Sequence, residues 1–315
     1  MSPLLVVRDL RVGFGSTAVV EGVSFDVAQG ETLALVGESG CGKSMTAFAL
    51  MRLLPEGASI QGGTIGFEGQ DLVQASPRAM RRVRGARIGL VLQEPMTALN
   101  PVRTIGAQVA EAVQQHRRMG RAGVRGRVLA LLELVGIPDP VGAAAAYPHT
   151  FSGGMRQRVM IAIAVACEPA LLIADEPTTA LDVTIQAQVL ELLARLQRQL
   201  GMAMLLITHD LGVVADWADR VAVMYAGRIV EQGAAAAVLA APAHPYALGL
   251  VGAAVGRGHY TAQRLVEIPG TVASAAGAPG CPFGPRCPRY DGDCDAGVPP
   301  LHGVGAGHDA ACIRV

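Results

Sequence analysis

The stretch GESGCGKS, Gly37 to Ser44, restricts the possible folds of this chain more than any other part of the sequence. It fits the pattern G-x-x-x-x-G-K-[ST] at every fixed position, and it stands between an apolar run, ETLALV, and a helical pattern, MTAFALMRLL. In such a strand–loop–helix unit, backbone N–H groups turn inward around phosphate oxygens and the positive end of the helix faces the anion. The stretch therefore predicts a phosphate-binding loop within an α/β fold.

Lys43 in this loop is the only lysine of the 315-residue chain, and arginine supplies the other 25 of its 26 basic residues. An ammonium is a compact charge on a flexible stem, whereas a guanidinium is a wide planar fork, so the ammonium suits a tight cradle of backbone amides. We expect Lys43 to reach the β- and γ-phosphates of a nucleotide and the Ser44 hydroxyl to bind Mg²⁺. The nucleotide contacts predicted in the loop are Gly37, Glu38, Ser39, Gly40, Cys41, Gly42, Lys43, Ser44 and Met45.

Acids and a histidine follow two further apolar runs. In LLIADE, four apolar residues lead to Asp175, the arrangement in which a Walker B aspartate holds Mg²⁺. Glu176 comes next and is expected to act on the attacking water as general base. His209 ends AMLLITHD, and strand ends in such sheets bind ligands, so it is expected to contact the γ-phosphate. Idle, solvated acids and a structural histidine are the alternative, but the phosphate loop upstream argues against it.

The order of apolar and polar residues indicates alternating strands and helices. This predicts a largely parallel sheet covered on both faces. After about residue 250 the chain becomes rich in Gly, Pro, Ala and Cys, with little periodicity, which indicates a loop-rich appendage. The strands are expected within 4–36 and at 171–176 and 203–210, and the helices within 104–135 and at 183–200.

Charge and hydropathy narrow the possible partners. The formal net charge is +0, which favours neither a nucleic acid nor an anionic membrane surface. The arginine-rich residues 78–87 lack nearby aromatics for base stacking and are interpreted as a solvated helix face. The most apolar run, 159–174, is interrupted by Glu168 and Pro169, and the N-terminus lacks the pattern of a secretory signal. We therefore expect a cytoplasmic chain that reaches a membrane only through partners.

A second anion site is predicted where SGGMRQ, Ser152 to Gln157, opens a helix, because serine is a good N-cap and the glycines expose backbone N–H groups. Here the sequence resembles the ABC ATPases. FSGGMRQR is similar to their signature, Gln93 to their Q-loop glutamine, Ala180–Asp182 to their D-loop and His209 to their switch histidine. Phe14 occupies the place of the aromatic residue that stacks on adenine in that family, although a core role is the alternative for a Phe near a strand.

This resemblance implies how a complete site is assembled. Two ATPase subunits enclose two nucleotides, and the signature of each completes the ATP site of the other. The catalytic set is then Lys43, Gln93, Glu176 and His209, and Mg²⁺ is held by Ser44, Gln93 and Asp175. The residues expected to reach the nucleotide of the opposite subunit are Ser152, Gly153, Gly154, Met155, Gln157 and Asp182.

Four further stretches resemble the ATPase subunits of oligopeptide/dipeptide-type importers: LQEPMTALNP, AHPYALGL, IPG and GCPFGPRCP. The resemblance covers all 315 residues and implies an ABC-type P-loop NTPase core, in which helices flank a parallel sheet. It also implies an N-terminal antiparallel β-subdomain and a small cysteine-containing C-terminal extension. The predicted division is an ATPase domain at 1–250, with a helical subdomain at about 94–160, and the extension at 251–315. Departures are small: Phe14 stands where Tyr is common, and Met155 replaces the Gln of the general signature.

The resemblance implies an ATPase that energises the import of short peptides. Its expected partners are two transmembrane permease subunits, a second and different ATPase chain, and an extracytoplasmic substrate-binding protein. The permease subunits would hold it at the cytoplasmic face of the membrane. Import of nickel or of a peptide-like conjugate is the alternative within the same machinery. A soluble ABC ATPase of translation or DNA repair is disfavoured, because each motif occurs once and no sustained heptads are present.

Four of the six cysteines, Cys281, Cys287, Cys294 and Cys312, lie near the end of the chain. In a reducing cytoplasm such a group suggests a metal more than disulfides. The spacing differs from the C-x₂₋₄-C pairs of structural zinc, whereas iron–sulfur clusters accept four cysteines at varied spacing. We expect a 4Fe-4S cluster, with zinc or no metal as the alternatives.

Overall fold

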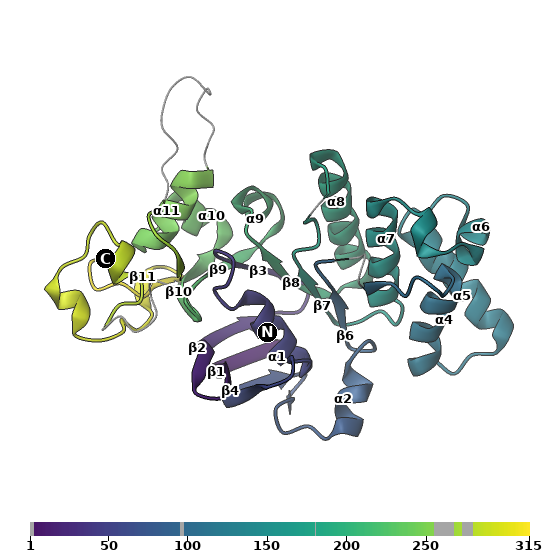
Figure 1. The fold of residues 1–315 in the computed structure, drawn as a ribbon, viewed down its shortest axis with the longest axis horizontal. Coiled ribbons are helices and arrows are strands. Elements are labelled where there is room, and N and C mark those ends of the chain that lie inside the picture. Colours follow the sequence, from purple (N-terminus) through teal and green to yellow (C-terminus); the bar gives the residue numbers. More distant parts are fainter. Residues whose placement is uncertain (1–2, 95–97, 180, 255–267, 273–279) are drawn as a thin grey trace. The chain divides into compact units, whose positions relative to one another are not determined.

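The computed structural model describes residues 3–94, 98–179, 181–254, 268–272 and 280–315 (Figure 1). The chain forms two compact units. The first comprises Met1–Val27, Thr32–Val73 and Leu206–Val315, and the second comprises Ala28–Glu31 and Gln74–Leu205. Among the described residues, no helix has both the length and the apolar character needed to cross a membrane.

The first unit contains an antiparallel sheet with the strand order β2-β1-β4-β5. In it, β1 (Leu5–Phe14) lies between β2 (Thr17–Val27) and β4 (Ala58–Phe67), and β5 (Gln70–Asp71) pairs with β4. Side chains of a strand alternate between the two faces of a sheet, and the apolar side chains of β1 are buried on one of them. The predicted N-terminal antiparallel β-subdomain is therefore present.

Five further strands of the first unit follow the order β11-β12-β10-β9-β3. They are β3 (Thr32–Val36), β9 (Arg220–Tyr225), β10 (Arg228–Ala234), β11 (His302–Gly305) and β12 (His308–Ala310). β3 pairs with β9 in parallel, and the other pairs are antiparallel. The end of the chain, which the sequence pattern indicates as loop-rich, thus extends a sheet. Strands of three and four residues are too short for periodicity to identify.

The helices of the first unit are α1 (Lys43–Met51), α9 (Leu211–Trp217), α10 (Ala235–Ala240) and α11 (Pro245–Ala254). An aromatic cluster lies in the core of this unit. The ring centroids of Tyr225 and Tyr246 are 4.7 Å apart, and Phe283 lies 5.2 Å from the first and 5.4 Å from the second. Residues from β9, α11 and the C-terminal extension therefore share one packed core.

The second unit has a parallel strand pair and most of the helices. β6 (Ile88–Val91) pairs with β7 (Leu171–Asp175), and β8 (Ala203–Thr208) leads from this unit into the first. The helices are α2 (Pro77–Val83), α4 (Ile105–His116), α5 (Arg121–Leu134), α6 (Pro140–Ala145), α7 (Gly153–Ala164) and α8 (Val183–Leu200). The helical region expected at 104–135 is thus two helices, separated at Arg117–Gly120, with Gly120 as the N-cap of α5.

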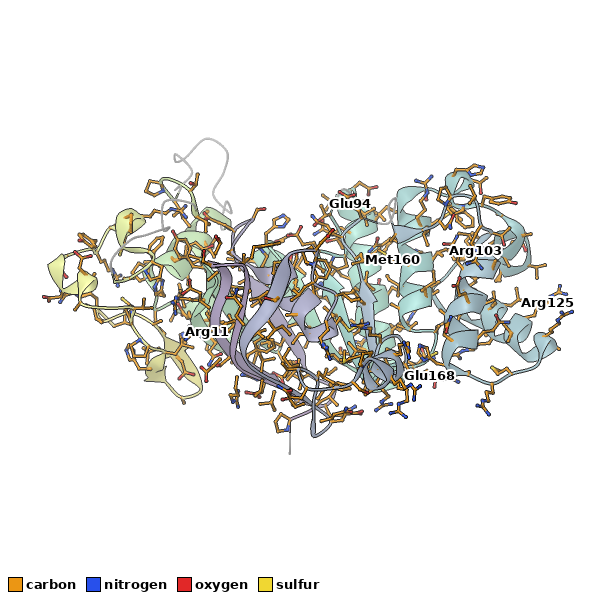
Figure 2. The ribbon with its side chains drawn as sticks, turned by 60° about the horizontal axis from the view of Figure 1, so that its bottom comes forward. Arg11, Glu94, Arg103, Arg125, Met160 and Glu168 are labelled. Carbon is orange, nitrogen blue, oxygen red and sulfur yellow. The ribbon has the colours of Figure 1, made fainter. Side chains whose placement is uncertain are left out.

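Helix α4 of the second unit is amphipathic. On α4, Ile105, Val109 and Val113 recur at helical spacing and are fully buried. The charged side chains of Arg103 and Arg125 in this region are exposed (Figure 2). Burial of this apolar stripe stabilises the helix, because the backbone hydrogen bonds of an isolated helix give only marginal stability in water.

A buried carboxylate joins three parts of the first unit. Glu231 on β10 is fully buried, and it accepts hydrogen bonds from the backbone N–H groups of Ala243 at 2.8 Å and His244 at 2.7 Å. His308 Nε2 on β12 lies 2.7 Å from the same carboxylate. Glu231 therefore fixes the start of α11 and the C-terminal hairpin to the sheet.

Glu231→Ala is expected to lower the free energy of unfolding by about 3–5 kcal/mol, because it leaves two backbone donors and His308 without their acceptor. Trp217 is the only tryptophan and lies on α9 of the same unit, so its fluorescence during urea denaturation measures the loss. The control is Glu56→Ala at an exposed position, where a change within about 0.5 kcal/mol is expected. Equal stability of the two variants would contradict this role of Glu231.

Candidate functional site

The phosphate loop of the first unit connects β3 to α1, as predicted. Gly42 has φ 104°, which is left-handed backbone that favours glycine, and it forms the N-cap of α1 without a side-chain cap. A Cβ on Gly42 would lie 2.8 Å from Val19 O, and one on Gly37 would lie 2.1 Å from Met224 O. Glycine is required at both positions because β2 and β9 approach the loop closely.

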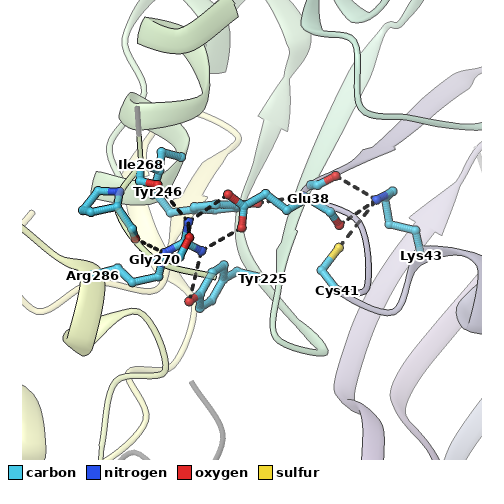
Figure 3. Close-up of polar contacts among 10 residues, drawn as sticks. Glu38, Cys41, Lys43, Tyr225, Tyr246, Ile268, Gly270 and Arg286 are labelled. Carbon is cyan, nitrogen blue, oxygen red and sulfur yellow. Dashed lines mark hydrogen bonds and ion pairs between the residues drawn. The ribbon is translucent and has the colours of Figure 1, made fainter. Parts of the chain in front are cut away.

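Lys43 is held inside this loop. Its side chain is 5% exposed, and Nζ donates to the backbone carbonyls of Gly37 at 2.7 Å and Glu38 at 3.0 Å, with Cys41 Sγ at 3.8 Å (Figure 3). Burial raises the pKa of the Cys41 thiol, and the Lys43 ammonium opposes that shift only in part. Cys41 is therefore an uncharged part of the loop, and the Lys43 ammonium is its positively charged group.

Two other predicted contacts belong to the first unit. Phe14 is the last residue of β1, and its side chain is 41% exposed. The structure thus rules out a core role and leaves the ring available for stacking. His209 directly follows β8, and it is exposed at the end of that strand.

The predicted catalytic acid of the second unit lies in strained backbone at the end of β7. Asp175 is the last residue of that strand and is 2% exposed. Glu176 follows with φ 46°, a left-handed conformation that costs about 1–3 kcal/mol for a residue other than glycine. Its Oε2 accepts hydrogen bonds from Gln93 Nε2 at 3.1 Å and Thr179 Oγ1 at 2.8 Å. The structure therefore brings Gln93 and Glu176 together, 83 residues apart in the chain.

Thr179 was not predicted as a site residue. Its hydroxyl donates to Glu176, and its backbone N–H donates to the Glu176 carbonyl at 3.2 Å. The signal that could have identified it is its position three residues after the acid, where a turn returns a hydroxyl to the carboxylate. Thr179 thus helps to orient the side chain of Glu176.

The predicted signature lies at the start of α7 in the second unit. Ser152 is its N-cap, and Ser152 Oγ accepts from the backbone N–H of Met155 at 3.3 Å, as the sequence predicts. A Cβ on Gly154 would lie 2.7 Å from Ile185 Cγ2, so glycine is needed where α7 packs on α8. The side chain of Gln157 is 1% exposed, and its Nε2 has no hydrogen-bond partner among the described residues.

The D-loop residues precede α8. Asp182 is the N-cap of α8, and its Oδ1 accepts from the backbone N–H of Ile185 at 3.0 Å. Leu181 Cδ2 would lie 3.6 Å from a Cβ on Gly153, so the D-loop lies next to the signature within this unit. Ala180 lies outside the described residues.

The four C-terminal cysteines belong to one small element of the first unit. The backbone N–H of Cys281 donates to Cys294 O at 2.9 Å, and all four thiols are free. Burial raises the pKa of Cys281 and of Cys287, and the thiol of Cys294 acts in the same direction on both. Among the described residues, no group of three or more potential ligands has the geometry to hold a metal ion. The 4Fe-4S cluster remains a prediction.

Residues 20–179, more than half of the chain, match the ABC transporter family. The chain belongs to the ABC transporter family. Residues 230–294 also match the C-terminal region of oligopeptide/dipeptide transporters. As a member of the family the chain is an ABC-type ATPase, and the predicted α/β fold of an ABC P-loop NTPase is confirmed.

Relatives support this assignment over nearly the whole chain. It is 51% identical to a probable peptide ABC transporter ATP-binding protein of Sinorhizobium fredii, over 99% of this chain and 95% of that protein. It is also 51% identical to the dipeptide transport ATP-binding protein DppD of Bacillus subtilis, over 95% of this chain and 91% of that protein.

Solved structures of ABC transporter components share the fold. The ABC transporter subunit cbiO1 of Clostridium perfringens is 28% identical with a TM-score of 0.67, over 76% of this chain and 92% of that one. The ATP-binding cassette MJ0796, solved with ADP and Pi, is 24% identical with a TM-score of 0.65, over 73% of this chain and 98% of that one. At this lower identity MJ0796 shows the fold alone.

Proposed function

We propose that this ABC transporter chain is the ATP-binding subunit of an importer of short peptides, and that it hydrolyses ATP to energise transport through permease subunits. The observation that carries the proposal is the 51% identity, over nearly the whole chain, to proteins named for peptide and dipeptide transport. The match of residues 230–294 to the C-terminal region of oligopeptide/dipeptide transporters supports the same substrate class.

In the first unit, the phosphate loop binds the nucleotide through its backbone N–H groups, and Lys43 moves from the carbonyls of Gly37 and Glu38 to the β- and γ-phosphates. The exposed Phe14 ring stacks on the base, and His209 contacts the γ-phosphate. These steps need little movement of the loop, since the glycine backbone already has the required turn.

In the second unit, Glu176 orients and deprotonates the attacking water. Its carboxylate is already oriented by Gln93 and Thr179. Asp175 and Gln93 of this unit would hold Mg²⁺ through their side chains, as would Ser44 of the phosphate loop through its hydroxyl, and hard oxygen ligands of this kind suit that ion. When bound, Mg²⁺ neutralises charge that develops on the phosphate oxygens.

A second ATPase subunit completes the site. We assign this role to a different chain, whose nucleotide would contact Ser152, Gly153, Gly154, Met155 and Asp182 of this one, whereas the predicted contact Gln157 is 1% exposed and is too buried to reach it. Residues 1–250 act as the ATPase domain, with the helical subdomain at about 94–160 against the permeases, and residues 251–315 act as the extension. An external binding protein delivers the substrate, and the chain lies at the cytoplasmic face, held by the permeases.

The test is ATP hydrolysis by the reconstituted transporter in lipid vesicles across a panel of di- and oligopeptides and nickel. We expect binding protein loaded with peptide to stimulate hydrolysis. Stimulation by nickel alone would replace the peptide assignment with a metal or conjugate importer. Co-purification with ribosomes or DNA, and not with permeases, would overturn the transport assignment and leave the ATPase assignment intact.

We further propose that Cys281, Cys287, Cys294 and Cys312 hold a 4Fe-4S cluster. The donor set supports this, because four free thiols lie in the extension, and Cys287 and Cys294 are near enough to Cys281 to act on its pKa. Anaerobically purified chain is expected to contain about four iron atoms and to be brown, whereas Cys287→Ser should lower both signals. A colourless chain without iron and with four reactive C-terminal thiols would reject the cluster, and bound zinc would favour the alternative.

A further inference from the structure

Arg286 of the C-terminal extension forms a partly buried bidentate ion pair with the phosphate loop, in which the Glu38 side chain is 29% exposed. The Arg286 side chain is 2% exposed. Arg286 Nη1 donates to Glu38 Oε2 at 2.7 Å, and Nη2 donates to Glu38 Oε1 at 2.9 Å (Figure 3). Two parallel charge-assisted bonds of this type fix both distance and orientation. An acid of the phosphate loop is therefore held by a residue 248 positions later in the chain.

The remaining donors of this guanidinium are also used. Arg286 Nε donates to Pro269 O at 2.6 Å, and Nη2 lies 3.3 Å from both Ile268 O and Gly270 O. Nη1 also lies 3.5 Å from Tyr225 Oη. Hydrogen bonding to Glu38 raises the pKa of Arg286, so the group remains charged. These partners fix the position of the guanidinium, and its two hydrogen bonds in turn fix the position of the Glu38 carboxylate.

Glu38 is held on its main chain as well. Its backbone N–H donates to Tyr246 Oη at 2.8 Å, and its carbonyl accepts from Lys43 Nζ at 3.0 Å. Tyr246 is positioned in turn by α11, since its own N–H donates to His244 Nδ1 at 3.0 Å. Burial lowers the pKa of His244 to about 4, which keeps this nitrogen free to accept. Glu38 therefore connects the C-terminal part of the chain to the lysine of the loop.

The backbone that carries Arg286 is held in place. The residue closes the short turn η3 (Gly284–Arg286), in which the Arg286 N–H donates to Phe283 O at 3.0 Å. Phe283 belongs to the aromatic core with Tyr225 and Tyr246. Movement of the guanidinium away from Glu38 would disturb that core, so the turn acts as a fixed support.

We propose that Arg286 is a positioning residue for nucleotide binding: through Glu38, it holds the phosphate-loop backbone in the geometry that receives the phosphates. This inference rests on the proposed nucleotide site. The C-terminal extension is then part of the ATP-binding apparatus and not only a region for partners or metal. Its contribution comes from the loop conformation, because Arg286 contacts Glu38 and not Lys43.

The test compares Arg286→Gln with Arg314→Gln in the full chain. Arg314 is the matched control, since it pairs with Asp291 and Asp293 in the same extension and, among the described residues, makes no hydrogen bond to the phosphate loop. Titration with a fluorescent ATP analogue should show an affinity lower by about tenfold or more for Arg286→Gln and changed less than about twofold for Arg314→Gln. Equal affinity of Arg286→Gln and the unaltered chain would overturn the proposal.

A double-mutant cycle separates positioning from a general loss of folding. Glu38→Gln, Arg286→Gln and the double variant are expected to bind the analogue about equally weakly, because both single changes remove the same contact. Additive losses would show that Arg286 acts by another route. If Arg286→Gln does not fold, Arg286→Lys gives the readout: a folded variant with unaltered affinity would reject the proposal. Lys43→Ala tests the nucleotide site itself, and unchanged binding in that variant would refute the site and not the Arg286–Glu38 contact.

Discussion

Lys43→Arg is expected to lower kcat/KM for ATP by about 10²–10³, although the substitution preserves the charge. The ammonium is 5% exposed and lies 2.7 Å and 3.0 Å from two carbonyls of its own loop. The glycines at 37 and 42 already approach neighbouring backbone as closely as their missing side chains allow. The loop therefore has no space for a planar guanidinium, which is wider and carries its charge farther from the stem.

Steady-state hydrolysis and nucleotide binding together measure this loss. Arg11→Lys is the control, because it makes the opposite substitution at an exposed position on β1. Its kcat/KM for ATP is expected to stay within about threefold of that of the unaltered chain. Activity of Lys43→Arg within threefold of the unaltered chain would show that charge alone suffices. The role assigned to the shape of the ammonium would then be wrong.

Glu176→Gln is expected to lower kcat by about 10²–10⁴ while ATP affinity changes less than about twofold. Glutamine has the same shape as glutamate and retains a carbonyl oxygen that can accept from Thr179 Oγ1. It cannot take a proton from water, and that step is the one assigned to Glu176. The variant should therefore bind ATP and remain occupied by it.

Single-turnover hydrolysis and equilibrium binding distinguish these two effects. Glu191→Gln is the control in the same unit, since Glu191 is exposed on α8 and no change is expected. Loss of binding together with hydrolysis in Glu176→Gln would assign the residue to nucleotide contact. An unchanged kcat would require another base.

The features that the sequence predicts correctly depend mostly on residues close together in the chain. The glycine turn at 37–44, the serine cap at 152 and the apolar run before Asp175 each depend on residues within a few positions. Backbone geometry and capping act over that range, so the pattern is visible in the chain itself. Apolar alternation likewise predicts strands within residues 4–36, where β1 and β2 lie, but the antiparallel β-subdomain itself was implied only by the resemblance to the ABC ATPases.

Contacts between distant residues account for what was missed. Arg286 is one arginine among 25, and nothing near it indicates a partner at position 38. The carboxylate of Glu231 looks ordinary in the sequence, yet its partners lie 12, 13 and 77 positions away. The role of Thr179 was not predicted for a different reason. A hydroxyl near an acid is common on protein surfaces, and its contact with Glu176 depends on the turn that follows β7.

The distance of 248 positions between Glu38 and Arg286 also bears on synthesis of the chain. At about 5–20 residues per second, a ribosome adds Arg286 roughly 12–50 s after Glu38. During this interval the loop, its glycines and its lysine already exist, but the guanidinium that fixes Glu38 does not. A nascent chain therefore acquires its braced phosphate loop only near the end of translation, and chains truncated before residue 286 never acquire it.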